Sequence, residues 1–176
     1  MDHTQLGRAG ELALALYALV TSDGEIQLYT PVADDDHTDA TAGRRGQVPA
    51  IAIQVKTARD VDKAGQVEAK ADFPAGQVRE HPAFLYAVLL LQSVSIGTMW
   101  LVPSPDFNRL ADRRVVGTRE IVHFFASPDK DDRWSSYRVQ PLELGTRLLQ
   151  IVDAQVGPLP RHLRGPGEGM LLAGRG

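Results

Sequence analysis

The fold of this protein is decided by residues 38–57, which read TDATAGRRGQVPAIAIQVKT. The glycines and arginines of 43–46 form a turn signal between two strand-like runs. The pattern predicts a β-hairpin with one strand over 38–42 and a returning strand over 49–57. The question this stretch raises is why polar side chains interrupt the returning strand.

The two faces of that returning strand differ in chemistry. Side chains alternate across a strand, so the apolar positions from Ile51 through Ile53 to Val55 share one face. The opposite face carries Gln54 and Lys56. An amide and an ammonium on one face, with an aspartate just upstream, indicate a functional site.

Residues before the hairpin predict a helix and one more strand. Apolar residues at helical spacing from Leu6 to Val20 favour a helix that Thr4 caps and Asp23-Gly24 ends. Within this helix Glu11 is the only carboxylate or base from Ala9 onward, so its charge requires a partner, a metal or an exposed position. A strand over 25–32 then completes a three-strand antiparallel meander.

Further elements follow the hairpin along the chain. A continuous apolar run over 83–92 predicts a central strand buried on both faces. The other expected elements are a strand or irregular stretch over 66–73, a short helix over 74–80, a strand over 97–102, a helix over 104–112, a strand over 120–126, an extended segment over 134–139, and a helix over 141–156. Both tryptophans are expected in the core.

Together these elements predict an α/β or α+β protein with a mixed central β-sheet flanked by helices. The length of 176 residues suits one domain, which we place over 1–156. Residues 157–176 are rich in Gly, Pro and Arg without periodicity, which predicts a flexible tail.

Composition excludes several function classes. The chain has no cysteine, which rules out disulfides, zinc-thiolate sites and cysteine nucleophiles. A net charge of −3 argues against bulk coating of nucleic acid but permits local contact. With no signal-peptide pattern and no apolar run long enough to cross a bilayer, we expect a cytoplasmic protein without membrane contact.

Four polar residues converge if the predicted strands pair: Glu11, Asp39, Gln54 and Lys56. Folding the hairpin about its turn places Asp39 opposite roughly residues 50–52, within diagonal reach of Gln54. Carboxylate and amide oxygens are ligands suited to Mg²⁺ or Mn²⁺. A lysine beside such an ion can orient water and stabilise negative charge, which is equipment for phosphodiester hydrolysis.

Structural readings of the same residues stay open at this stage. Asp39 could be a turn or strand-edge residue, and Gln54 with Lys56 could form the solvated face of an edge strand. The run of aspartates at 34–36 is expected to be loop solvation, and His37 beside it a surface residue.

The chain resembles the PD-(D/E)XK nuclease superfamily, whose fold is found in restriction endonucleases and Holliday junction resolvases. The matching text is GRAGELALALYAL at 7–19, PVADDDHTDATA at 31–42 and IAIQVKT at 51–57. The resemblance covers about residues 7–58, with plausible core strands continuing to 102. It implies a restriction endonuclease-like core in αβββαβ order.

By this resemblance Asp39 binds the metal directly, Gln54 supplies the second motif ligand, Lys56 is the catalytic lysine and Glu11 completes the shell from the helix. Gln54 departs from the commoner Asp or Glu and removes one negative charge from the metal site. The implied activity is a Mg²⁺- or Mn²⁺-dependent endonuclease that hydrolyses phosphodiester bonds, in DNA, by a metal-activated water. Several members of the superfamily are dimers, so a homodimer is also compatible with it.

A different class of function fits the same residues. The chain could be a nuclease-like domain without catalysis that serves in nucleic-acid binding or protein assembly. Gln54 and the acidic net charge motivate this alternative.

Overall fold

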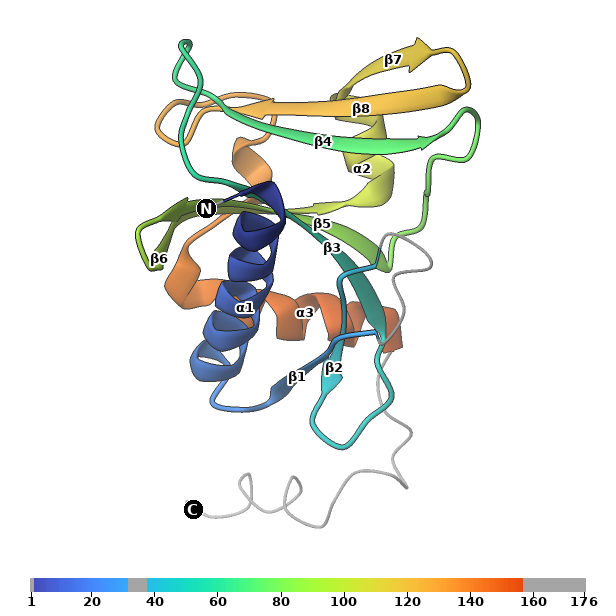
Figure 1. The fold of residues 1–176 in the computed structure, drawn as a ribbon. Coiled ribbons are helices and arrows are strands. Elements are labelled where there is room, and N and C mark those ends of the chain that lie inside the picture. The colour runs from blue at the N-terminus through green and yellow to red at the C-terminus, as the bar shows by residue number, and fades with distance from the viewer. Residues whose placement is uncertain (1, 32–37, 157–176) are drawn as a thin grey trace, which may run out of the picture.

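The computed structural model describes residues 2–31 and 38–156. A central sheet lies between two layers (Figure 1). Helices α1 (His3–Thr21) and α3 (Leu144–Val156) cover one face, while a smaller sheet and helix α2 (Ser104–Leu110) cover the other. The expected mixed α+β architecture is confirmed. The expected tail over 157–176, together with 34–36 and His37, lies outside the described residues.

Helix α1, His3–Thr21, begins two residues earlier than the sequence predicted. Asp2 is its N-cap in place of Thr4, because the Asp2 carboxylate accepts from Gln5 N while the Gln5 amide accepts from Asp2 N, a reciprocal capping box. The chain leaves the helix through positive φ at Asp23 and Gly24, as expected. No helix within 2–31 or 38–156 is long and apolar enough to cross a membrane.

The central sheet has the strand order β1-β2-β3-β5-β6-β9. Its first part is the expected antiparallel meander of β1 (Ile26–Tyr29), β2 (Ala40–Arg44) and β3 (Ile51–Ala58). Strand β5 (Phe84–Gln92) then pairs parallel with β3, and β6 (Ser95–Pro103) and β9 (Arg138–Val139) continue antiparallel. The sheet is therefore mixed, and β5 lies at its centre.

The chain reaches β5 from β3 through a strand of the second sheet, where the αβββαβ order calls for a helix. Strand β4 (Val67–Pro74) pairs with β8 (Arg119–Ala126), which pairs with β7 (Asp112–Val116). Of the two structures expected for 66–73, a strand or an irregular stretch, the strand is confirmed. Strand β7 was not predicted, because all five of its residues are exposed and carry no apolar alternation.

The short helix predicted over 74–80 is wrong. The backbone turns there instead: Ala75 N donates to Thr118 O at 2.9 Å, and Gly76 has φ +77°. The hydrogen bond comes from Thr118 in the turn before β8, more than 40 residues away in sequence, so local propensity could not reveal it.

Four further helical segments complete the fold. Helix α2 (Ser104–Leu110) has Pro103 at its N-cap position and no side-chain cap. The Ser104 hydroxyl bonds instead to the backbone of His81. The 3₁₀ turns Ser135–Tyr137 and Pro141–Glu143 precede α3 (Leu144–Val156), so the helix predicted over 141–156 starts with a tighter turn.

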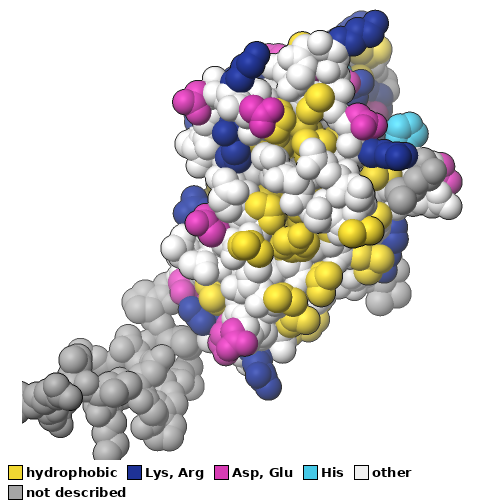
Figure 2. Space-filling view, turned by 90° about the vertical axis from the view of Figure 1, so that its left-hand side faces the viewer, with side chains coloured by type: hydrophobic (Ala, Val, Ile, Leu, Met, Phe, Trp, Pro, Cys, Tyr) yellow, Lys and Arg dark blue, Asp and Glu magenta, His cyan; other side chains and the backbone are white. Residues whose placement is uncertain are grey.

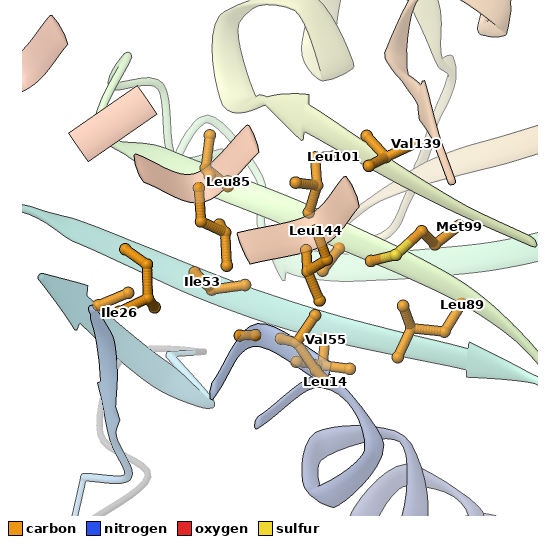
Figure 3. Close-up of a cluster of buried hydrophobic side chains, with 14 of the residues drawn as sticks. Leu14, Ile26, Ile53, Val55, Leu85, Leu89, Met99, Leu101, Val139 and Leu144 are labelled. Carbon is orange, nitrogen blue, oxygen red and sulfur yellow. The ribbon is translucent and has the colours of Figure 1, made fainter. Parts of the chain in front are cut away.

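Two hydrophobic cores lie on opposite faces of the central sheet. Figure 3 shows the first, in which Leu14 of α1 and Leu144 of α3 pack against Ile53 and Val55 of β3. The second lies under the smaller sheet and is aromatic; it includes Tyr86, Trp100, Phe107, Phe124 and Trp134. Strand β5 alternates between them, which confirms the central strand buried on both faces and both tryptophans as core residues.

One buried carboxylate links β7, β8 and the turn after β4. Glu120 accepts from Arg113 Nε at 2.8 Å and from Gly76 N at 3.2 Å. The hydrogen bond from Arg113, and then the one from Gly76, hold the pKa of Glu120 below its ordinary value, while desolvation opposes them. The carboxylate form is therefore favoured in the folded state.

Lowering the pH should remove this contribution. A folded-state pKa below the unfolded value of about 4.3 gives stability that is full above that value and is lost as pH falls through the folded-state pKa. We expect Glu120→Gln to unfold at a lower temperature at pH 7 and to lose less further stability between pH 7 and pH 3 than the wild type. Thermal unfolding followed by circular dichroism checks this, and identical pH profiles would contradict it.

Candidate functional site

Asp39 lies at the start of β2, against the polar face of β3. The last paired residues of the hairpin are Ala40 and Ile53, and continuing this register sets Asp39 beside Gln54. The expected position opposite 50–52 was thus wrong by several residues, because the hairpin loop is longer than its turn signal indicated. The expected proximity of Asp39 to Gln54 is confirmed, and the two residues face each other directly where a diagonal position was expected.

The Asp39 carboxylate is fixed by the backbone of β3. Val55 N donates to Asp39 Oδ2 at 2.6 Å, and Asp39 N donates to Ile53 O at 3.0 Å. A carboxylate oxygen thus takes the place of a strand carbonyl at the point where β2 begins. This orients the side chain toward the segment between Gln54 and Lys56.

Gln54 is buried with its amide oxygen unsatisfied. Its residue is 3% exposed, and no group among the described residues donates to its Oε1. A buried acceptor without a donor costs free energy, about 1–3 kcal/mol. Such an atom beside a carboxylate is suited to meet a cation or a donor that binds there.

Tyr86 is the neighbour of Gln54 across the β3–β5 pairing. Its hydroxyl is also buried without a hydrogen-bond partner among the described residues. Burial raises the pKa of Tyr86 well above its ordinary value, and the nearby Arg79 guanidinium opposes this only in part. The phenol is therefore neutral and keeps its proton for donation.

Arg79 borders the site from the loop before β5. Its Nη1 donates to Thr38 Oγ1 at 3.1 Å, and its guanidinium lies 4.7 Å from the Phe84 ring centroid. It lines a hollow of about 350 Å³ together with His81. Sequence reasoning missed both Arg79 and Tyr86, since neither belongs to a local pattern; only strand pairing and the loop path bring them to Gln54.

Lys56 lies two residues beyond Gln54 on the same strand and is half-buried. It lines a second hollow, of about 720 Å³, between the start of α1, the end of β3 and β4. Arg59 and Lys70 share this hollow with three carboxylates, those of Asp60, Asp62 and Glu68, so its cations and carboxylates are equal in number. Lys70 is itself paired with Glu68 at 2.8 Å. The hollow with Arg79 and the hollow with Lys56 therefore lie at the two ends of the polar face of β3, but neither is lined by Asp39 or Gln54.

Glu11 lies on the part of α1 that packs near β3, but its carboxylate forms an ion pair within the helix. Helix α1 approaches β3 so closely at Gly10 that an added Cβ would lie 1.9 Å from Thr57 Oγ1. The Glu11 carboxylate, however, accepts from Arg8 Nη1 at 2.6 Å within the helix. Of the four predicted residues, the structure groups Asp39, Gln54 and Lys56, while Glu11 lies on the adjacent helix in an ion pair.

A cation site built from these residues would carry little negative charge. Within 2–31 and 38–156 no three His, Asp or Glu side chains gather closely enough to hold a metal. A metal here would need the Asp39 carboxylate, the Gln54 amide oxygen and water or substrate. The unsatisfied Gln54 oxygen beside a fixed carboxylate fits such a hard cation.

The mixed sheet, with α1 over its meander and a second sheet behind it, defines a nuclease-like α+β fold. The chain is similar to a solved bacterial homing endonuclease, I-Ssp6803I, with a TM-score of 0.58 and 16% sequence identity. The match covers 88% of this chain and 96% of that one. No protein-family model matches the chain, and neither does any curated protein. The likeness therefore establishes the fold.

Proposed function

We propose that this protein is a metal-dependent nuclease of the PD-(D/E)XK type that hydrolyses phosphodiester bonds in DNA. The observation that carries the proposal is the buried, unsatisfied Gln54 Oε1 on the strand position that faces Asp39, with Lys56 two residues further along the same strand. Similarity to a bacterial homing endonuclease supports the same class of activity.

In this proposal Asp39 and Gln54 hold Mg²⁺ or Mn²⁺, and Glu11 joins them after exchanging its Arg8 contact. The ion supplies neutralisation of phosphate charge and lowers the pKa of water. The backbone N–H of Val55 keeps the Asp39 carboxylate in place throughout. Lys56 stabilises the negative charge that develops on the phosphate in the transition state.

Binding of the DNA backbone follows from the cations around the site. Arg79 borders the hollow on one side, whereas Arg59 and Lys70 line the hollow that contains Lys56 on the other. Such contacts to phosphate give affinity without sequence readout and weaken as salt rises. The net charge of −3 gives no overall attraction to DNA, so these local cations would have to supply it.

The direct test is cleavage of plasmid, linear, single-stranded and branched DNA in Mg²⁺, Mn²⁺ or EDTA. We expect cutting in either metal, none in EDTA, and none by Asp39→Asn, which keeps the shape of the side chain but not its charge. Asp129→Asn, in the loop after β8 and outside the lining of both hollows, is the matched control and should cut normally. Cutting by Asp39→Asn at the wild-type rate would refute the assignment.

A second prediction concerns the negative charge that is absent because Gln54 is neutral. Gln54→Glu adds a buried carboxylate, which should lower the melting temperature of the metal-free protein because the charge is desolvated. The same carboxylate should tighten Mn²⁺ binding on the order of tenfold, because affinity rises with ligand charge. Mn²⁺ should then raise the melting temperature of the variant more than that of the wild type.

Calorimetry and thermal unfolding with and without Mn²⁺ measure both effects. The exposed Gln92→Glu is the control, since it adds the same charge away from the site. Equal Mn²⁺ responses of Gln54→Glu and Gln92→Glu would argue against a metal at Gln54.

One observation favours the non-catalytic alternative, a nuclease-like domain that only binds nucleic acid or assembles with protein. Glu11 is engaged by Arg8, and Asp39 is engaged by Val55 N, so both carboxylates have partners without a metal. If the wild type cuts no DNA substrate and calorimetry detects no Mn²⁺ binding, this alternative replaces the nuclease.

A further inference from the structure

Apolar side chains on the surface of this protein are less informative than polar atoms in its interior. Figure 2 views the left-hand side of the molecule as Figure 1 draws it, and shows hydrophobic side chains gathered in its middle and lower parts. Exposed apolar side chains are ordinary on protein surfaces. The exposed apolar stripe of α1 is of this kind and consists of Leu12, Leu16, Leu19 and Val20. Buried polar atoms without a hydrogen-bond partner are rare, and each needs an explanation.

Two such atoms occupy paired positions on neighbouring strands. Gln54 of β3 and Tyr86 of β5 are register partners in the parallel pairing, so their side chains leave the sheet on the same face, about 4.8 Å apart at the backbone. Gln54 is 3% exposed, and Tyr86 is fully buried. Among the described residues, neither Gln54 Oε1 nor the Tyr86 hydroxyl has a hydrogen-bond partner. The side of the sheet that faces the smaller sheet therefore holds both atoms.

Packing explains the Tyr86 ring but not its hydroxyl. The ring stacks on Phe107 with 3.9 Å between centroids and meets Phe84 edge-on at 5.3 Å. A phenylalanine at this position would keep both contacts and would bury no polar atom. The hydroxyl loses its hydration on folding and regains no hydrogen bond from the described residues, which destabilises the metal-free protein. A polar group kept at such a cost indicates a role in a bound state.

We propose that Tyr86 is a positioning residue for Gln54, whose amide nitrogen donates to the Tyr86 hydroxyl oxygen when the amide oxygen turns to a cation held at Asp39. The inference rests on the proposed metal site and deepens it. An acceptor behind the amide fixes its orientation and makes its oxygen more basic, as outer-shell partners do for metal ligands in general. Gln54 needs this support more than an aspartate or glutamate would, because its oxygen carries no full charge.

The proton of the Tyr86 hydroxyl also has an acceptor in the same region. Asn108 follows Phe107 on α2, is 4% exposed, and has no donor to its Oδ1 among the described residues. Its Nδ2 donates to Arg79 O at 2.8 Å, which ties it to the loop before β5. Burial raises the pKa of Tyr86 well above its ordinary value, so the protonated hydroxyl can donate to Asn108 Oδ1 while it accepts from Gln54. These contacts would satisfy all three unpartnered atoms together.

Tyr86→Phe separates this role from packing. Its metal-free melting temperature should be no lower than that of the wild type, because the ring contacts stay and an unpartnered hydroxyl is removed. Its dissociation constant for Mn²⁺ in calorimetry should rise about tenfold, the usual loss when an outer-shell partner of a metal ligand is removed. A Tyr86→Phe variant that melts lower and binds Mn²⁺ as the wild type does would show a structural role only and would overturn the proposal.

Tyr137→Phe is the matched control. The Tyr137 hydroxyl hydrogen-bonds to Asp106 and lies on the segment before β9, so its removal loses a formed contact outside the site. This variant should melt at a lower temperature and bind Mn²⁺ with the affinity of the wild type.

The Gln54→Glu background tests whether Tyr86 acts through the amide. A carboxylate has no N–H to donate, so Tyr86→Phe should change the Mn²⁺ dissociation constant of Gln54→Glu by less than about twofold. An equal loss in both backgrounds would mean that Tyr86 acts on the site by another route and would overturn the positioning role. Wild-type protein that binds no Mn²⁺ would remove the proposed metal site and this inference together. A wild type that binds Mn²⁺ and a Tyr86→Phe variant that binds it equally well would remove the inference alone.

Discussion

Lys56→Ala should lower the rate of metal-dependent DNA cleavage by at least about a hundredfold, the usual loss when one group that stabilises transition-state charge is removed. Lys56 lies on the polar face of β3 with Gln54, and it lines the larger of the two hollows that flank the site. Its ammonium is the cation that the proposed mechanism requires at the phosphate. The rate under single-turnover conditions, with saturating metal, measures the effect on chemistry.

Two controls separate catalysis from simple charge loss. Lys70→Ala removes a cation from the same hollow, so it should weaken DNA binding and its salt dependence without the same loss of single-turnover rate. Lys56→Arg keeps the charge but not the compact ammonium, and we expect it to recover only part of the rate. If Lys56→Ala and Lys70→Ala reduced the rate equally, Lys56 would be a DNA-binding residue and no more.

Trp134→Ala should destabilise the protein by about 3–5 kcal/mol, the range for removal of a fully buried large aromatic side chain. The Trp134 ring lies 4.5 Å from the Phe124 ring and 5.6 Å from the Phe107 ring, between centroids. It therefore joins α2, β8 and the segment before β9 into the second core. Urea unfolding at neutral pH measures the loss.

Trp134→Phe is the informative partner variant. The indole nitrogen is buried without a hydrogen-bond partner among the described residues, so replacing it with a phenyl ring sacrifices volume but no hydrogen bond. We expect a loss smaller than that of Trp134→Ala. A loss under about 1 kcal/mol for Trp134→Ala would show that the second core does not depend on this ring.

Local patterns predicted most of the central sheet. They failed where the structure depends on contacts between segments that lie far apart in the sequence. The meander and the central strand were predictable, because alternation and a continuous apolar run report burial directly. The turn after β4 was mistaken for a helix, because the hydrogen bond between Ala75 and Thr118 that forms it is not local. Strand β7 gave no signal, because its exposed residues need not alternate.

In the candidate site, too, local patterns predicted some residues, while strand pairing decided the others. The alternation of side chains along β3 placed Gln54 and Lys56 on one face. The order of the strands predicted that Asp39 lies near them. The carboxylate contact with Val55 N, the unsatisfied Gln54 oxygen and the adjacent Tyr86 depend on strand register and on parallel pairing with β5. A register is set by the whole sheet, so no window of sequence contains it.

The sequence by itself determined the mixed α+β class, the hairpin with its two chemically distinct faces, and the positions of Asp39, Gln54 and Lys56 on one pair of strands. Period-two and helical alternation carry this information because burial of apolar groups dominates folding. Only the tertiary structure decided that Glu11 pairs with Arg8, that Arg79 and Tyr86 border the site, and that α1 leaves an apolar stripe uncovered. The reason is physical: α1 is apolar on nearly all sides, and which side is covered depends on how the sheet and α3 pack against it.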